Sequence, residues 1–201
     1  MQLALIMNPL SNLSKYEVLL ASNSPRRKQL LADLGIDFGV CALNGINESY
    51  PADTPTEDVA LVVSRIKADA YRALITSNQL IITADTVVIC DNQVLGKPHN
   101  EADARNMLRS LSGKTHKVVT GVTITTASHS ISFKSVTEVD FAELSDDEIN
   151  FYVEKFHPLD KAGAYGIQEW IGCAGIRGIR GSFYNVMGLP LHRLYTELKR
   201  F

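Results

Sequence analysis

One stretch of the sequence decides the fold: Val18-Leu-Leu-Ala-Ser-Asn-Ser-Pro-Arg-Arg-Lys-Gln-Leu-Leu-Ala-Asp-Leu-Gly-Ile36. It predicts a buried strand, a polar loop and a helix. Ser24 is a favourable N-cap, and Pro25 suits the first helical position. Gly35 stands where many helices end in a left-handed residue. Three leucines at helical spacing form one apolar stripe: Leu30, Leu31 and Leu34.

The first turn of this helix is basic, which its own electrostatics disfavour. Arg26, Arg27 and Lys28 lie at the positive end of the helix dipole, where each exposed cation costs about 0.3–1 kcal/mol. A bound polyanion would reverse that sign. Together with the hydroxyls of Ser22 and Ser24 and the free N–H groups, the guanidiniums would form a polyphosphate site. The alternative is a solvated basic turn.

The rest of the chain alternates between strand and helix signals. Strands are predicted over 37–41, 80–90, 117–126 and 131–141, and a hairpin over 176–186, turning near 180–182. Helices are predicted after N-caps at Thr56, Asn100 and Ser145, and from 188–190 to about 200. The apolar stripe of the helix after Thr56 is Val59, Val62, Val63, Ile66, Ala70, Ala73 and Leu74. The pattern indicates a mixed α/β fold, with residues 1–15 as a loosely held extension and 16–201 as one domain.

The composition favours a small-molecule ligand. The 201 residues are 45% hydrophobic and carry a net charge of -2, so no basic field for nucleic acid is expected. The N-terminus lacks the pattern of a signal peptide or a membrane span. Cys41, Cys90 and Cys173 are odd in number and widely spaced. Reduced core thiols in a cytoplasmic protein are the expected interpretation.

Two carboxylates are candidates for chemistry. Asp85 lies inside an apolar strand, where an ionised carboxylate is costly unless it is hydrogen-bonded, paired or bound to a metal. It could ligate metal, act as a general base, or be a satisfied structural residue. Glu48, in a polar loop, could be a second ligand of a hard cation such as Mg²⁺, or a solvated loop residue.

Two lysines could offset phosphate charge. Lys97 lies between Gly96 and Pro98, directly after a strand, and Lys67 lies beside the apolar stripe of its helix, where it could also simply snorkel. The sequence lacks a P-loop, a dinucleotide fingerprint, zinc-ligand spacing and the nucleophile elbow of α/β-hydrolases. Known phosphate and hydrolase motifs therefore do not explain these residues.

Six ordered motifs resemble the Maf family of nucleoside triphosphate pyrophosphatases, known as septum-formation proteins. They are Ser22-Asn-Ser-Pro-Arg-Arg27, Ala84-Asp-Thr-Val-Val88, Gly96-Lys-Pro98, Leu111-Ser-Gly113 with His116 and Thr120-Gly121, Asp160-Lys-Ala-Gly-Ala-Tyr-Gly-Ile-Gln168, and Gly181-Ser-Phe-Tyr-Asn-Val-Met-Gly-Leu-Pro-Leu191. The resemblance runs from about residue 17 to the C-terminus. It implies an elongated, two-lobed mixed sheet with flanking helices and a deep central cleft, similar to inosine triphosphate pyrophosphatase.

The resemblance also implies an activity and its residues. The family hydrolyses nucleoside triphosphates between the α- and β-phosphates with Mg²⁺ or Mn²⁺. Asp85 matches its proton acceptor and Glu48 its acidic metal partner. The positions that match its phosphate-binding residues are Ser22, Arg26, Arg27, Lys67 and Lys97. A house-cleaning role, a link to cell-division arrest and a homodimer are further implications.

The base preference implied by the resemblance is pyrimidine. Residues 160–168 look like the family branch that prefers dTTP and UTP, and the specificity positions match Arg26, Thr86 and Gln168. A neutral amide offers one donor and one acceptor edge, as uracil and thymine require. Because Glu169 follows directly, a shift of one residue would weaken the pyrimidine interpretation. The 7-methyl-GTP branch, with an acidic residue at the matching end, is the second alternative. A non-catalytic nucleotide sensor is the third alternative.

Overall fold

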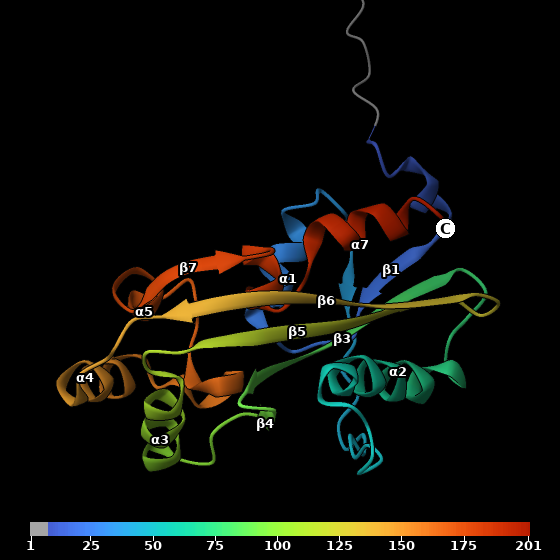
Figure 1. Cartoon of the computed structure of the whole chain (residues 1–201). Helices are drawn as coiled ribbons and strands as arrows, with labels where there is room; N and C mark the ends of the chain where they lie inside the picture. The colour runs from blue at the N-terminus through green and yellow to red at the C-terminus, as the bar shows by residue number, and fades with distance from the viewer. Residues whose placement is uncertain (1–7) are drawn as a thin grey trace, which may run out of the picture.

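The computed structural model describes residues 8–201, which build an elongated α/β molecule around one seven-stranded mixed sheet (Figure 1). The strand order is β2-β1-β3-β5-β6-β7, and β4 pairs with β3. β1 is parallel to β2 and β3, whereas the other pairs are antiparallel. The strands are β1 (Glu17–Leu20), β2 (Gly39–Val40), β3 (Gln79–Cys90), β4 (Gln93–Leu95), β5 (Thr115–Thr125), β6 (Ser130–Phe141) and β7 (Ile176–Arg180).

Helices flank the long strands, with α7 and α2 on opposite sides of them in Figure 1. The α-helices are α1 (Pro25–Ala32), α2 (Val59–Arg72), α3 (Glu101–Leu111), α4 (Asp146–Phe156), α5 (Trp170–Ala174), α6 (Phe183–Met187) and α7 (Leu191–Leu198). Short 3₁₀ turns cover Ser11–Lys15, Thr56–Asp58, Pro158–Asp160 and Ala162–Ala164. None of the helices between residues 8 and 201 has the length and apolar character needed to cross a bilayer.

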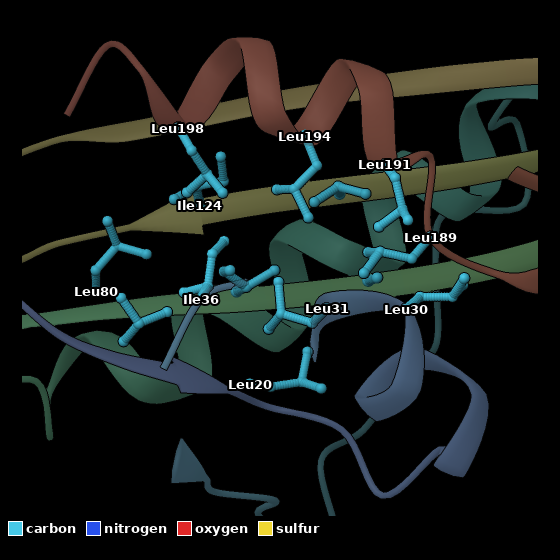
Figure 2. Packing of buried hydrophobic residues seen from close by; sticks show 14 of the residues in the cluster. Leu20, Leu30, Leu31, Ile36, Leu80, Ile124, Leu189, Leu191, Leu194 and Leu198 are labelled. Carbon is cyan, nitrogen blue, oxygen red and sulfur yellow. The ribbon is translucent and has the colours of Figure 1, made fainter. Parts of the chain in front are cut away.

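Two large core clusters lie at opposite ends of the long strands. In the first, α1 and α7 pack on β1, β3 and β5 through leucines such as Leu20, Leu31 and Leu194 (Figure 2). In the second, α3 and α4 pack on β5 and β6 around Phe141 and Tyr152. A smaller third cluster joins α2 to β3 and β5. The predicted elongated, two-lobed α/β fold is therefore confirmed.

One edge of β3 loses its strand partner in the middle. β1 pairs with β3 as far as Ile82, and β4 pairs with it only from Val88 onwards. Within the described residues, the stretch 83–87 of β3 has a strand neighbour only on its other side, where β5 runs. An open edge leaves backbone groups that must find other partners. This gap is where the candidate site lies.

Several local predictions are confirmed because they rest on neighbouring residues alone. The side chains of Ser24 and Asn100 accept the predicted capping hydrogen bonds, and Ser145 and Glu148 form the reciprocal capping box. The long β5–β6 hairpin forms as expected. Gly35 ends the α1 region with a φ of 68°.

Three predictions about elements are wrong. Thr56 does not cap a helix; it begins a 3₁₀ turn, and α2 begins at Val59 without a side-chain cap. Leu74 lies beyond the end of α2 and is 62% exposed, whereas Val59 and Val63 of the predicted stripe are buried, together with Ala60, Ser64, Ala68 and Tyr71. The second arm of the hairpin predicted over 176–186 is helix α6. Its N-cap, the Ser182 side chain, binds the N–H of the following turn.

The predictions for the N-terminus and the cysteines need correction. The expected loose extension is packed where it is described: Leu10 and Leu13 are buried, and the Asn12 side chain donates to the Leu198 carbonyl at 2.9 Å. The residues 1–7 lie outside the described part of the chain, and the domain boundary at 16 stays a prediction. All three cysteines are free thiols, but of the three only Cys90 is buried: Cys41 is partly buried, and Cys173 on α5 is exposed.

The close contact between α2 and β5 yields a test of the fold. A Cβ atom at Gly121 would lie 2.4 Å from the backbone of Ala60 and of Leu61, which cannot yield without moving α2. We expect Gly121→Ala to lower the free energy of unfolding by about 1–3 kcal/mol in urea titrations. Gly178→Ala on β7 is the matched control, because its Cβ would meet nothing within 4 Å. Equal stability of the two variants would contradict this packing.

Candidate active site

A cleft opens at the gap in β3 and collects the residues singled out in the sequence. It consists of a cavity of about 450 Å³ and an adjoining hollow of about 380 Å³ that share several lining residues. The structure places eight of the nine candidates around the cavity: Arg26, Arg27, Glu48, Lys67, Asp85, Thr86, Lys97 and Gln168. The ninth, Ser22, lines the adjoining hollow. Residues from distant parts of the chain thus face one space.

An ammonium group joins the two candidate carboxylates. The Lys67 Nζ lies 2.8 Å from Asp85 Oδ1 and 3.0 Å from Glu48 Oε2. The Lys67 side chain is 13% exposed and that of Asp85 20%, so this pair is poorly solvated, whereas Glu48 is half exposed. α2 brings Lys67 to β3, where its ammonium gives the poorly solvated Asp85 carboxylate an ion-pair partner.

Each of the three guanidinium nitrogens of Arg27 donates a hydrogen bond to the protein. Its Nε donates to the Gly188 carbonyl at 2.9 Å, its Nη1 to the Ala84 carbonyl at 2.9 Å, and its Nη2 to Thr86 Oγ1 at 3.0 Å. The Ala84 carbonyl belongs to the open edge of β3. Burial lowers the pKa of Arg27 and the Asp85 carboxylate opposes this shift, yet a guanidinium remains charged. Arg27 therefore satisfies one backbone carbonyl in the gap left between β1 and β4.

The hydroxyl of Thr86 is part of an ordered chain of hydrogen bonds. Thr86 Oγ1 lies 2.9 Å from Thr120 Oγ1, which donates to the Asn185 carbonyl at 3.0 Å. Since Thr120 uses its hydrogen there and Arg27 can only donate, Thr86 must donate to Thr120. Thr86 can then offer a ligand only a lone pair.

The start of α1 is arranged for anions but has internal partners too. Ser24 Oγ accepts from the Arg27 N–H, and Ser22 Oγ accepts from the Ser24 N–H. The Arg26 Nη1 lies 2.6 Å from Asp160 Oδ2 across the cleft. Burial alone would raise the pKa of Asp160, but hydrogen bonds from Lys161 and Arg26 outweigh it and lower the pKa to about 2.

Lys97 and Gln168 are the candidates whose side chains have no internal partner. Both are exposed at the cavity wall, and neither forms a hydrogen bond or ion pair with another residue of the described range 8–201. Lys97 follows β4, and Gln168 ends the glycine-rich loop between α4 and α5. These two side chains are available to a ligand without breaking any contact.

Sequence reasoning missed four charged or aromatic residues of the cavity wall as site residues: Tyr50, Asp160, Lys161 and Tyr165. Three of them stand in the motif 160–168, so their place beside Gln168 was a usable signal. The Tyr165 hydroxyl lies 2.7 Å from Nε2 of His116, which is buried. Burial lowers the pKa of His116 to about 4, so this histidine is neutral near pH 7 and supports the wall.

The fold and the cleft define a class of protein. A mixed α/β structure whose cavity gathers two carboxylates and several cations suits a phosphorylated small molecule bound with a metal ion. Residues 17–201 match the family described as Maf-like protein. The chain belongs to the Maf family, as the sequence motifs predict.

Named relatives cover nearly the whole chain. A dTTP/UTP pyrophosphatase of Phocaeicola vulgatus is 59% identical over 191 residues, which cover 95% of this chain and 99% of the relative. A dTTP/UTP pyrophosphatase of Porphyromonas gingivalis is 53% identical over 194 residues, covering 96% and 98%. Among solved structures, a HAM1 protein from Coxiella burnetii is similar with a TM-score of 0.49 and 17% identity, covering 92% of this chain and all of that one.

The contacts of the two arginines predict different effects of substitution. Lysine at 27 cannot reach three separately placed acceptors, so Arg27→Lys should lower the free energy of unfolding by about 2 kcal/mol. Arg26→Lys should change it by about 1 kcal/mol or less, because its partner Asp160 is half exposed. Urea titrations of both variants test this. Equal losses would show that Arg27 is not an anchor.

Proposed function

We propose that the protein hydrolyses dTTP and UTP to the nucleoside monophosphate and pyrophosphate. The observation that carries this proposal is the convergence of Lys67, Asp85 and Glu48 with Arg26 and Lys97 on one cleft. Relatives at 59% and 54% identity, each covering 95% of this chain, are dTTP/UTP pyrophosphatases. A cleft that places two carboxylates beside several cations suits phosphoanhydride hydrolysis better than binding alone.

The donor set of the cleft fits a divalent metal ion. Glu48 and Asp85 both contact the Lys67 ammonium, so the two carboxylates face the same part of the cleft. Within residues 8–201, no group of three His, Cys, Asp or Glu side chains could hold a metal by itself. Mg²⁺ and Mn²⁺ accept such a site, because substrate phosphates and water complete their coordination. When bound, the ion neutralises charge on the phosphates and on the leaving pyrophosphate.

In the proposed mechanism, Asp85 orients the attacking water and accepts its proton. A P–O bond to the water oxygen forms while the α–β anhydride P–O bond breaks, and the pyrophosphate leaves with the bonding electron pair. Arg26 and Lys97 hold the phosphates, and Lys67 holds the Asp85 carboxylate in position through its ion pair. Stabilising the charge that develops on the leaving group accounts for much of the expected acceleration.

Base recognition is assigned to Gln168 and Thr86. Gln168 is exposed at the cavity wall and offers both a donor and an acceptor, which suits the O4 and N3–H edge of uracil or thymine. Thr86 can only accept, since its hydrogen is bonded to Thr120. Neither residue carries the negative charge that a methylated guanine would favour.

We also propose a cytoplasmic location, which the three free thiols support. The absence of nucleic-acid binding, the homodimer and the link to cell division stay predictions from the sequence.

A substrate panel tests the function. The purified protein is mixed with Mg²⁺ or Mn²⁺ and with dTTP, UTP, CTP or 7-methyl-GTP, and the released pyrophosphate is measured. We expect turnover with dTTP and UTP to exceed that with the other two. Preference for 7-methyl-GTP would favour the other branch of the family. Nucleotide binding without pyrophosphate release would favour the sensor.

The role of Asp85 has its own test. Asp85→Asn removes the proton acceptor while keeping the shape, so kcat with dTTP should fall by about 10²–10⁴-fold. Asp91→Asn, at the exposed turn after the same strand, is the matched control, because asparagine tolerates its φ of 49°. Circular dichroism confirms the folding of both. Wild-type turnover in Asp85→Asn would refute the mechanism.

A further inference from the structure

A series of ion pairs with alternating charges connects the basic turn of α1 to the glycine-rich loop. Arg26 contacts Asp160, whose other carboxylate oxygen lies 2.7 Å from the Lys161 Nζ. The same ammonium lies 3.1 Å from Glu169 Oε1. The Lys161 side chain is 8% exposed and that of Glu169 18%, so the inner part of this series is shielded from water. A buried ammonium requires both of its carboxylate partners.

This series of charged contacts ends at a tyrosine in the core of the second lobe. Tyr152 on α4 is fully buried, and its hydroxyl donates to Glu169 Oε2. The same hydroxyl accepts from the Gly166 N–H at 3.0 Å. Tyr152 therefore holds the loop at two points, one on each side of Gln168. Burial and the Glu169 carboxylate raise the pKa of Tyr152, so the hydroxyl keeps its proton.

The loop is folded tightly at the point that Tyr152 holds. A Cβ atom at Gly166 would lie 3.0 Å from Gln168 Nε2, from Glu169 Cδ and from Lys161 Cε. The Gln168 amide thus lies over Gly166 on the cavity side, although it has no hydrogen-bond partner of its own within the described residues. Its position depends on the backbone beneath it.

We infer that Tyr152, acting through Glu169 and Gly166, is a positioning residue that sets the base preference of the site by holding Gln168 in place. This inference rests on the proposed function, because it assigns a cause to the preference for uracil and thymine. It also gives Glu169 a role other than base recognition. Glu169 does not line the cavity, and its two oxygens bind Lys161 and Tyr152.

A double-mutant cycle tests this inference. Tyr152→Phe removes only the hydroxyl, Gln168→Ala removes the amide, and the third variant carries both changes. The ratio of kcat/KM for dTTP to that for CTP is measured for each. We expect Tyr152→Phe to raise the KM for dTTP by about 5–10-fold, to leave kcat within about threefold, and to lower the ratio by a similar 5–10-fold.

The coupling between the two changes separates positioning from a general structural role. If Tyr152 acts through Gln168, its substitution will barely change the ratio in the Gln168→Ala background. A general loss of folding would instead lower activity with both substrates equally. Tyr195→Phe on α7 is the matched control, because its hydroxyl forms no hydrogen bond within the described residues. It should match the wild type.

Several results would overturn the inference. An unchanged KM and ratio in Tyr152→Phe, or effects that multiply in the double variant, would show that Tyr152 does not act through Gln168. If Tyr152→Phe fails to fold, Glu169→Gln serves in the same cycle, because it keeps the size and removes the charge. A wild type that releases no pyrophosphate from dTTP refutes the proposed function itself. If the wild type is active and Tyr152→Phe has the same KM and substrate ratio, only the inference is refuted.

Discussion

The unpaired edge of β3 is the constraint on which the site depends. Successive side chains of a strand point to opposite faces, so a complete sheet would separate Asp85 from Thr86. Because β1 ends its pairing at Ile82 and β4 begins only at Val88, the cleft wraps around the bare edge and reaches both side chains. The strand can thus present an acid and a hydroxyl to one ligand.

That edge also explains the basic start of α1. Three cations at the positive end of the helix dipole are unfavourable, and on the sequence alone they indicate a bound polyanion. The structure supplies partners for two of them: Arg27 reaches the Ala84 carbonyl on the bare edge, and Arg26 reaches Asp160. The unfavourable placement at the helix dipole is therefore offset in part inside the protein. Arg27 acts as an anchor of the cleft, while Arg26 lines it and pairs with the more exposed Asp160.

The sequence predicts the features that adjacent residues or family motifs determine. It does not predict the features that depend on contacts between residues far apart in the sequence. The caps at Ser24 and Ser145 and the long hairpin need only local signals. The family resemblance implies nine site residues, and all nine line the cavity or the adjoining hollow. The segment Phe183–Met187 is rich in strand-forming residues, yet it is helical. Asn185 inserts its amide between the Val118 carbonyl and Thr137, a tertiary contact that overrides propensity. Likewise, no local pattern reveals that Tyr152 and Glu169 meet.

The contacts at the two ends of the series from Arg26 to Tyr152 differ in strength. The weaker end is at the phosphate side of the cleft, which suits a site that must admit a ligand. Asp160 is 55% exposed, so its pair with Arg26 contributes about 1 kcal/mol or less. Under the proposed function, a triphosphate would take over Arg26 at that small cost. Lys161 and Tyr152 are buried, and their contacts do not depend on Arg26. Ligand binding at the phosphate end therefore leaves the loop beneath Gln168 held, because the exposed link breaks before the buried one.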